Sequence, residues 1–356
     1  MNIIISTISN RNLSLKNHVY IYVLNIIIIE GLVAMRVKTP VVITIICLVT
    51  VASLAASSSD PSDTNNPGGT TAHYAPARMP VMSAKLLIAN DRLFTYVSVN
   101  GQKKKLFFVD NGWSHTTVDP RLVREFTMVA EKNVAYKALD KKRVEATSGF
   151  IDSMTVGDLE IIAPRVRKSE LMAVLSRGVN KRVFGVLAYQ TMSPYLTTFD
   201  FKSKQVLFSG HDKENLNRIL GNENLISLDF GPSTWSKQSK QIFSVRMKLN
   251  GREVDAVVDL GYNGGVLTTR DASDLGMDRF FPNKSFDVAI GGYKGKGYRH
   301  ELRTAEIGGQ TFNGIHIILF KTEQAPQFTI IGVNFLKKFE VTFDYKNRKL
   351  YLVPYA

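Results

Sequence analysis

The sequence predicts an all-β protein built from two similar lobes, and three observations carry that prediction. Short apolar runs alternate with turn residues, and no long helical periodicity interrupts them, as is typical of β proteins. The apolar run from Leu106 ends on Asp110, and Gly112 follows two positions later. The run from Ala256 repeats this arrangement around Asp259 and Gly261.

The surroundings of the two Asp motifs also correspond. Upstream of each, an apolar strand pattern closes on an Asn-Gly pair, Asn100-Gly101 and Asn250-Gly251, which predicts a hairpin turn. Downstream, residues 198–202 match residues 342–346. An internal duplication explains this shared register better than chance does.

The chain divides in order into five segments. We expect an upstream segment and signal peptide over 1–56, a disordered linker over 57–80, a first lobe over 81–212, an interlobe connection over 213–224 and a second lobe over 225–356.

The start of the chain predicts export. Arg36 and Lys38 precede an apolar stretch over 40–56 that ends in small residues, which is the order of a secretory signal. Met35 is therefore the expected start, and the location is secreted or periplasmic. The alternative is that residues 40–56 are retained as a membrane anchor.

Within each lobe the pattern predicts short strands and little helix. In the first lobe we expect strands over 85–88, 93–99, 159–166 and 196–208, a short helix over 120–126 and a hairpin over 131–153. In the second lobe we expect strands over 225–230, 242–249, 315–320 and 340–353, a short helix over 271–277 and a hairpin over 287–300.

Composition excludes several classes of function. The formal net charge is +14, but the charges are scattered, which favours a solvated basic surface, and no aromatic-basic nucleic-acid signature is present. The one cysteine, Cys47, lies in the apolar run, and the six histidines are dispersed. We therefore expect no metal site, no thiolate chemistry and no nucleic-acid partner.

A strand that buries its end on a carboxylate is costly unless the carboxylate is used. A single Asp-x-Gly is ordinarily a turn in which the Asp bonds its own backbone. Two such motifs in register, each with matching flanks, resemble the retropepsin and pepsin type of aspartic protease over roughly residues 81–356. Ile330-Ile331-Gly332 fits that family's apolar-apolar-Gly signature, and Val186-Leu187-Ala188 is a weaker counterpart.

The resemblance implies a bilobal aspartic-protease-like fold with a cleft between the lobes. It implies that Asp110 and Asp259 form a catalytic dyad that shares one proton and activates a water. No metal or cofactor is needed. The implied partner is an extended peptide or unfolded protein that adds as a strand, and the implied state is a monomer.

The resemblance also assigns supporting residues. Loop support for the dyad falls on Asn111, Gly112, Ser114, Leu260, Gly261 and Asn263, with Ser114 and Asn263 expected to bond the carboxylates. The cleft or its flaps would be lined by Tyr136, Tyr293, Trp113 and Tyr262. For Trp113 and Tyr262 the alternative is a buried packing role.

Five positions depart from the family pattern, and one of them is Ala188, which replaces the Gly expected in the first lobe. Asn111 and Leu260 stand where the family has a Thr or Ser that bonds across the lobe junction, and Leu260 has no polar side-chain atom. Trp113 and Tyr262 stand where small residues are usual. The sequence therefore predicts an aspartic endopeptidase and leaves two rivals open. One is a peptide-binding module without cleavage, and the other is a structural protein tethered by residues 40–56.

Overall fold

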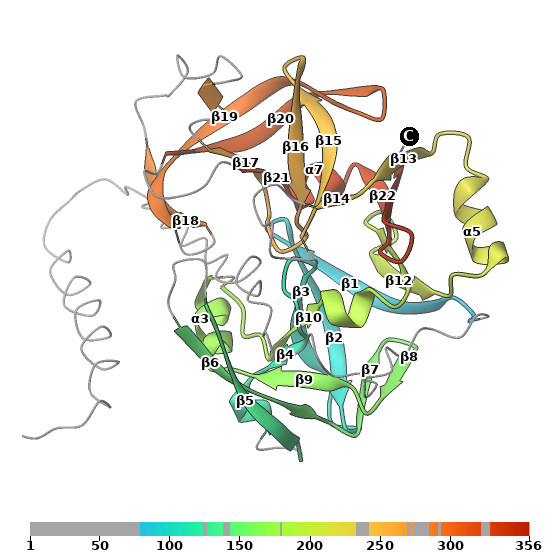
Figure 1. Cartoon of the computed structure of the whole chain (residues 1–356), viewed down its shortest axis with the longest axis vertical. Coiled ribbons are helices and arrows are strands. Elements are labelled where there is room, and N and C mark those ends of the chain that lie inside the picture. Colours follow the sequence, from blue (N-terminus) through green and yellow to red (C-terminus); the bar gives the residue numbers. More distant parts are fainter. Residues whose placement is uncertain are drawn as a thin grey trace, which may run out of the picture. The chain divides into compact units, whose positions relative to one another are not determined.

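The computed structural model describes residues 79–123, 127–137, 143–178, 180–232, 242–268, 272–273, 285–290, 293–321 and 328–355 (Figure 1). The expected signal segment, the start at Met35, Cys47 and nearly all of the linker lie outside this range. The expected helix over 271–277 lies outside it except for residues 272–273. No helix within the described residues is both long and apolar enough to cross a membrane.

In its described residues the first lobe is a run of short strands with three small helices. The strands are β1 (Met82–Ala89), β2 (Arg92–Val99), β3 (Lys105–Asp110), β4 (Thr117–Val118), β5 (Val129–Lys137), β6 (Arg143–Phe150), β7 (Ser153–Val156), β8 (Leu159–Ile162), β9 (Arg165–Lys168), β10 (Gly185–Ala188), β11 (Leu196–Asp200) and β12 (Gln205–Ser209). The helices are α2 (Pro120–Val123), α3 (Leu171–Gly178) and α4 (Tyr189–Met192).

The second lobe repeats this style. Its strands are β13 (Ile226–Asp229), β14 (Gly231–Pro232), β15 (Phe243–Leu249), β16 (Arg252–Val258), β17 (Gly265–Thr268), β18 (Phe286–Ile290), β19 (Tyr293–Ile307), β20 (Gln310–Lys321), β21 (Thr329–Ile331), β22 (Phe339–Asp344) and β23 (Lys349–Pro354). Helix α7 (Val333–Leu336) follows β21, and α5 (Lys213–Leu220) connects the lobes.

The strands form two sheets. A 15-stranded sheet runs in the order β13-β23-β22-β11-β12-β1-β2-β3-β10-β4-β9-β6-β5, with β7 and β8 off this path. An 8-stranded sheet runs in the order β14-β15-β16-β21-β17-β20-β19-β18. The larger sheet joins the lobes, because β11 of the first pairs antiparallel with β22 of the second. At this seam the hydroxyls of Thr198 and Thr342 lie 2.7 Å apart.

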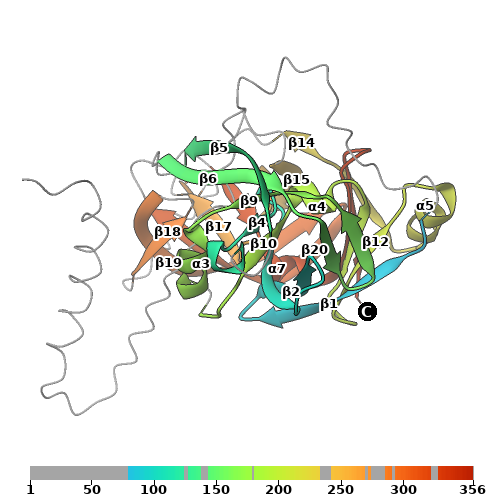
Figure 2. The ribbon, with the colours of Figure 1, turned by 90° about the horizontal axis from the view of Figure 1, so that it is seen from below.

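The predicted hairpins are present. Asn100-Gly101 and Asn250-Gly251 all have positive φ, between 47° and 82°, which Asn and Gly tolerate best. The hairpin expected over 131–153 is β5 paired with β6, which lie side by side in both views (Figures 1 and 2). The hairpin expected over 287–300 is β18 paired with the start of β19.

The connection between the lobes contains a helix that the sequence analysis did not predict. Helix α5 begins after Asp212, whose carboxylate accepts the Asn215 N–H at 2.9 Å. Ile219 is buried on its inner side against Leu196 and Tyr351. A short helix with so few apolar residues gives too weak a periodic pattern to be recognised, although Asp212 is a good N-cap.

Candidate active site

Two strands deliver the two aspartates. Asp110 is the last residue of β3, which runs parallel to β10 with Ala188 opposite the aspartate. Asp259 follows β16, which runs parallel to β21, and its N–H donates to the Ile331 carbonyl at 3.0 Å. Each side chain is only 2% exposed. The two apolar runs therefore end on buried carboxylates in equivalent positions of the two lobes.

Each carboxylate is held by the glycine two positions later. The Gly112 N–H donates to Asp110 Oδ1 at 2.8 Å, and the Trp113 N–H reaches the same oxygen at 3.1 Å. In the second lobe the Gly261 N–H donates to Asp259 Oδ1, also at 2.8 Å. Backbone donors therefore orient both carboxylates in the same way.

The backbone of Gly261 brings the two carboxylates together. A Cβ placed on Gly261 would lie 2.4 Å from both Cγ and Oδ2 of Asp110, so that carboxylate rests against the loop that holds Asp259. Together with the hydrogen bond from Gly261 to Asp259, this places the two carboxylates within about 8 Å of each other. Both carboxylates therefore belong to one site at the junction of the lobes.

Gly261 consequently has no room for a side chain. Gly261→Ala is expected to displace Asp110, to lower stability by about 1–3 kcal/mol through overpacking and to abolish any activity that depends on the pair. Gly264→Ala is the matched control, because the nearest atom to its added Cβ is 3.8 Å away. Denaturant unfolding of both variants measures the difference, and equal stabilities would contradict this packing.

The Asn111 side chain spans the lobe junction beside the two aspartates. Its Nδ2 donates to the Val258 carbonyl at 2.9 Å, and its Oδ1 accepts the Leu260 N–H at 2.7 Å. All of these atoms belong to buried residues. An amide has one donor group and one acceptor, so one side chain makes both cross-lobe bonds.

The Leu260 side chain makes no polar contact at the lobe junction. Its side chain is fully buried in the main hydrophobic core, while its backbone serves Asn111. Leu260→Thr is therefore expected to lower the free energy of unfolding by about 1–3 kcal/mol, because the added hydroxyl enters an apolar pocket. Leu260→Met is the volume-conserving control, with an expected cost below about 1.5 kcal/mol. A more stable Thr variant in thermal unfolding would overturn this reading.

Trp113 and Tyr262 are packing residues, and the expectation that they line a cleft is wrong. They are 4% and 1% exposed and belong to two separate apolar clusters. Trp113 Nε1 donates to Thr117 Oγ1 at 2.9 Å. Burial, followed by the charge of Asp259, raises the pKa of the Tyr262 hydroxyl well above its ordinary value. Large rings after each glycine fill space inside the lobes.

A second buried phenol near the dyad was missed by sequence reasoning. Tyr345 is 6% exposed and stacks on Phe230 and Phe343. Burial and the charges of Tyr189 and Asp110 raise the pKa of its hydroxyl well above the ordinary value, with Asn111 acting in the opposite direction. Tyr345 lies in the repeated segment 342–346, and that repeat is the sequence feature that could have drawn attention to it. Its burial, however, depends on packing between distant strands.

That Ser114 and Asn263 bond the carboxylates of Asp110 and Asp259 stays a prediction, and the structure shows other contacts for both residues. The Ser114 hydroxyl lies 2.7 Å from His115 Nδ1, and the Asn263 carbonyl accepts the Asn334 N–H at 3.0 Å. Tyr136 lies in β5 and Tyr293 begins β19, and their side chains lie outside the described part of the structure.

The stability of the fold is expected to depend on pH through His115, which lies two residues after Trp113. Burial and the positive charges of Arg167 and Arg165 lower its pKa to about 3. Between pH 6.5 and about 3 the unfolded chain therefore binds a proton that the folded chain does not. Stability is expected to fall as pH is lowered through this window, by on the order of 2–3 kcal/mol at pH 4 from this residue.

His115→Gln should reduce this dependence. His316→Gln is the control, because its side chain is 78% exposed. The test measures the free energy of unfolding of each variant at pH 7 and at pH 4. An identical change between the two pH values in wild type and His115→Gln would contradict the role of His115.

The last residue of the apolar-apolar-Gly signature differs between the lobes. It is Ala188 at the end of β10 and Gly332 after β21. Gly332 admits no side chain, because a Cβ there would lie 2.3 Å from the Gly264 carbonyl oxygen and 2.4 Å from that of Tyr262. Ala188, its first-lobe counterpart, carries a fully buried methyl group. The first lobe therefore has room at this position that the second lacks.

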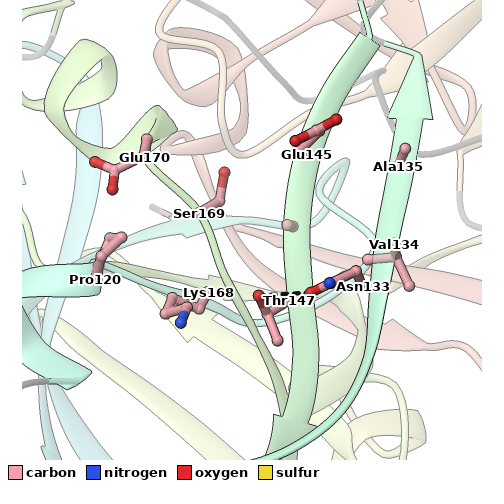
Figure 3. A pocket seen from close by; sticks show the side chains of 10 residues that line it. Pro120, Asn133, Val134, Ala135, Glu145, Thr147, Lys168, Ser169 and Glu170 are labelled. Atoms are coloured by element: carbon pink, nitrogen blue, oxygen red, sulfur yellow. Dashed lines mark hydrogen bonds between the residues drawn. The ribbon is translucent and has the colours of Figure 1, made fainter. Parts of the chain in front are cut away.

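A cavity of about 430 Å³ opens on the β5–β6 hairpin, opposite the start of α2 and the end of β9 (Figure 3). Its walls carry both signs of charge, with Glu145 and Glu170 facing the same space as Lys168. Within the described residues, no group of three or more His, Cys, Asp or Glu side chains is arranged to hold a metal ion.

Known proteins resemble this chain in part of its sequence or in its fold. Residues 245–338 match the family described as "gag-polyprotein putative aspartyl protease". The aspartic proteinase from Irpex lacteus superposes with a TM-score of 0.50 at 14% identity, covering 78% of this chain and 98% of that one. Basic 7S globulin from soybean (TM-score 0.50) and conglutin gamma from lupine seeds (0.51) match at 10% identity, each covering 78% of this chain and 95% of theirs.

None of the curated proteins matches the sequence. The identities to the solved structures are low, so those likenesses establish the fold. The prediction of an all-β, two-lobed fold of the aspartic-protease type is confirmed.

Proposed function

We propose that this chain, which has the two-lobed aspartic-proteinase fold and a second lobe matching the gag-polyprotein aspartyl protease family, is an endopeptidase. Asp110 and Asp259 would form its catalytic pair. The observation that carries the proposal is the contact of the Asp110 carboxylate with Gly261, whose N–H orients Asp259.

The chemistry follows from two carboxylates in one site. They share one proton, because two adjacent charges are costly in a buried setting. The ionised partner takes a proton from a water as that water attacks the peptide carbonyl, and the protonated partner stabilises the developing oxyanion. The substrate lies extended and adds its backbone to the hairpins. Both aspartates come from one chain, so we propose a monomer.

The test is incubation of the purified chain with an unfolded protein between pH 3 and pH 8, with and without a statine-type peptide. We expect new peptide termini by mass spectrometry that the statine-type peptide suppresses. No cleavage at any pH in this range would refute the endopeptidase, since a carboxylate pair holds one proton somewhere within it.

A second candidate is a module that binds an extended peptide without cutting it. The buried, apolar Leu260 and the rings of Trp113 and Tyr262 favour it, because they replace the polar and small residues of the family pattern. Two of the structures with this fold are named as 7S globulins. Binding of an unfolded substrate with no cleavage would select this function.

We also propose export. The motive is the basic, apolar and small-residue order after Met35. The mature chain would begin near Ala56, in a secreted or periplasmic location, and a chain still carrying residues 40–56 would be anchored instead. Sequencing the N-terminus of the protein from its native host distinguishes the two.

A further inference from the structure

A second cavity, of about 420 Å³, lies along β1, and no residue of the two Asp loops lines it. Five consecutive residues of one strand, Lys85 to Ala89, contribute to its wall. The remaining lining residues are Phe94, Leu106, Lys181 and Lys204. Side chains alternate between the faces of a strand, so a wall of consecutive residues means that the cavity follows the strand's edge.

No strand of the described part of the chain pairs with that edge over the second half of β1. Strand β12 pairs with β1 only over Met82–Lys85, and the next contact is the Leu86 N–H donating to the Lys204 carbonyl at 2.8 Å. Hydrogen-bonding directions alternate along an antiparallel strand. The N–H and C=O of Ile88 therefore point to the same edge as the Leu86 N–H, beyond the end of β12, and can receive a further strand.

The cavity combines an apolar floor with a cationic rim. Leu87 and Leu106 are half-buried in its wall and pack against the buried Phe94. Lys85, Lys181 and Lys204 are exposed, and none of the three makes an ion pair within the described residues. No acidic side chain lines the cavity. Such a rim selects a ligand with negative charge, and such a floor selects one with apolar side chains.

We propose that this groove binds an extended acidic peptide segment, which pairs with the edge of Leu87–Ala89. Its apolar side chains would rest on Leu87 and Leu106, and its carboxylates would meet Lys85, Lys181 and Lys204. An open strand edge favours a peptide over other anionic amphiphiles, because it offers backbone hydrogen bonds in addition to charge. The groove is a docking site separate from the dyad, and its occupancy does not depend on cleavage.

The test uses the full chain with Asp110→Asn, so that no probe is cut. The probe is a fluorescein-labelled hexapeptide alternating glutamate and valine, titrated by fluorescence anisotropy. Changing Lys85, Lys181 and Lys204 together to Gln is expected to weaken binding about tenfold or more. The matched control changes three exposed lysines elsewhere, Lys213, Lys338 and Lys346, to Gln and removes the same net charge.

Two further measurements distinguish backbone pairing from charge attraction, and a peptide ligand from a lipid. A hexapeptide with N-methylated backbone amides keeps its charge but cannot form a strand, and it is expected to bind about tenfold more weakly. Equal loss in the control triple variant, or equal affinity of the N-methylated peptide, would overturn the proposal. Binding of laurate or of anionic phospholipid vesicles in place of the peptide, lost in the groove variant, would also overturn it in favour of a lipid site.

Discussion

Asp110→Asn and Asp259→Asn are each expected to lower the rate of peptide hydrolysis by about a thousandfold or more. An amide neither takes a proton from water nor donates one as an acid, so the pair loses a proton state that the reaction requires. The asparagine Oδ1 still accepts the Gly112 N–H in the first case and the Gly261 N–H in the second. The fold should therefore persist, which circular dichroism and thermal unfolding check.

Asp229→Asn is the matched control for this substitution. Its side chain is 83% exposed and pairs only with Lys349 at the surface, a type of interaction that contributes little to stability. Its hydrolysis rate should equal that of the wild type. Unchanged cleavage by the Asp110→Asn, Asp259→Asn double variant would eliminate the dyad mechanism.

Asn111→Ala is expected to produce the largest loss of stability. It leaves the Leu260 N–H and the Val258 carbonyl buried without their cross-lobe partner, at a cost of about 1–3 kcal/mol for each group. The expected fall in the free energy of unfolding is therefore about 2–6 kcal/mol. Denaturant titration measures it, and the slope with denaturant reports whether the two lobes still unfold together.

The Asn111→Thr variant separates the contribution of the two cross-lobe hydrogen bonds to stability from that of side-chain packing. A hydroxyl can donate and accept, so a smaller loss than in the alanine variant is expected. Asn133→Ala is the control, since its amide oxygen only accepts an exposed hydrogen bond from Thr147 at 3.2 Å. An Asn111→Ala variant within about 0.5 kcal/mol of the wild type would show that the junction does not depend on this residue.

The sequence was informative where chemistry is local. The Asn-Gly pairs predict hairpins because those two residues adopt positive φ at low cost, and the structure places Asn100, Gly101, Asn250 and Gly251 there. The apolar runs that end on Asp110 and Asp259 likewise predict strands that end on carboxylates, whereas the meeting of the two carboxylates in one site was implied by the family resemblance. The inferences of hairpins and strands need only neighbouring residues.

The sequence was silent where the answer depends on distant segments. Asn111 could be recognised as a possible donor, but its two partners lie in the other lobe, about 150 residues away. Burial of Trp113 and Tyr262, and the low pKa of His115 beside Arg167, follow from packing that no local pattern specifies. The sequence could likewise not show that the junction needs no polar side chain at position 260. That conclusion depends on Asn111, which bonds the backbone of Val258 and Leu260.

A crystal structure of the chain with a bound statine-type peptide tests the central claim most directly, because it measures the relation of Asp110 to Asp259. The account predicts the statine hydroxyl within hydrogen-bonding distance, about 2.6–3.2 Å, of both carboxylates, in the place of the attacking water. Carboxylates more than about 10 Å apart, or a peptide bound with its hydroxyl remote from both, would contradict the account, since neither arrangement allows one shared proton.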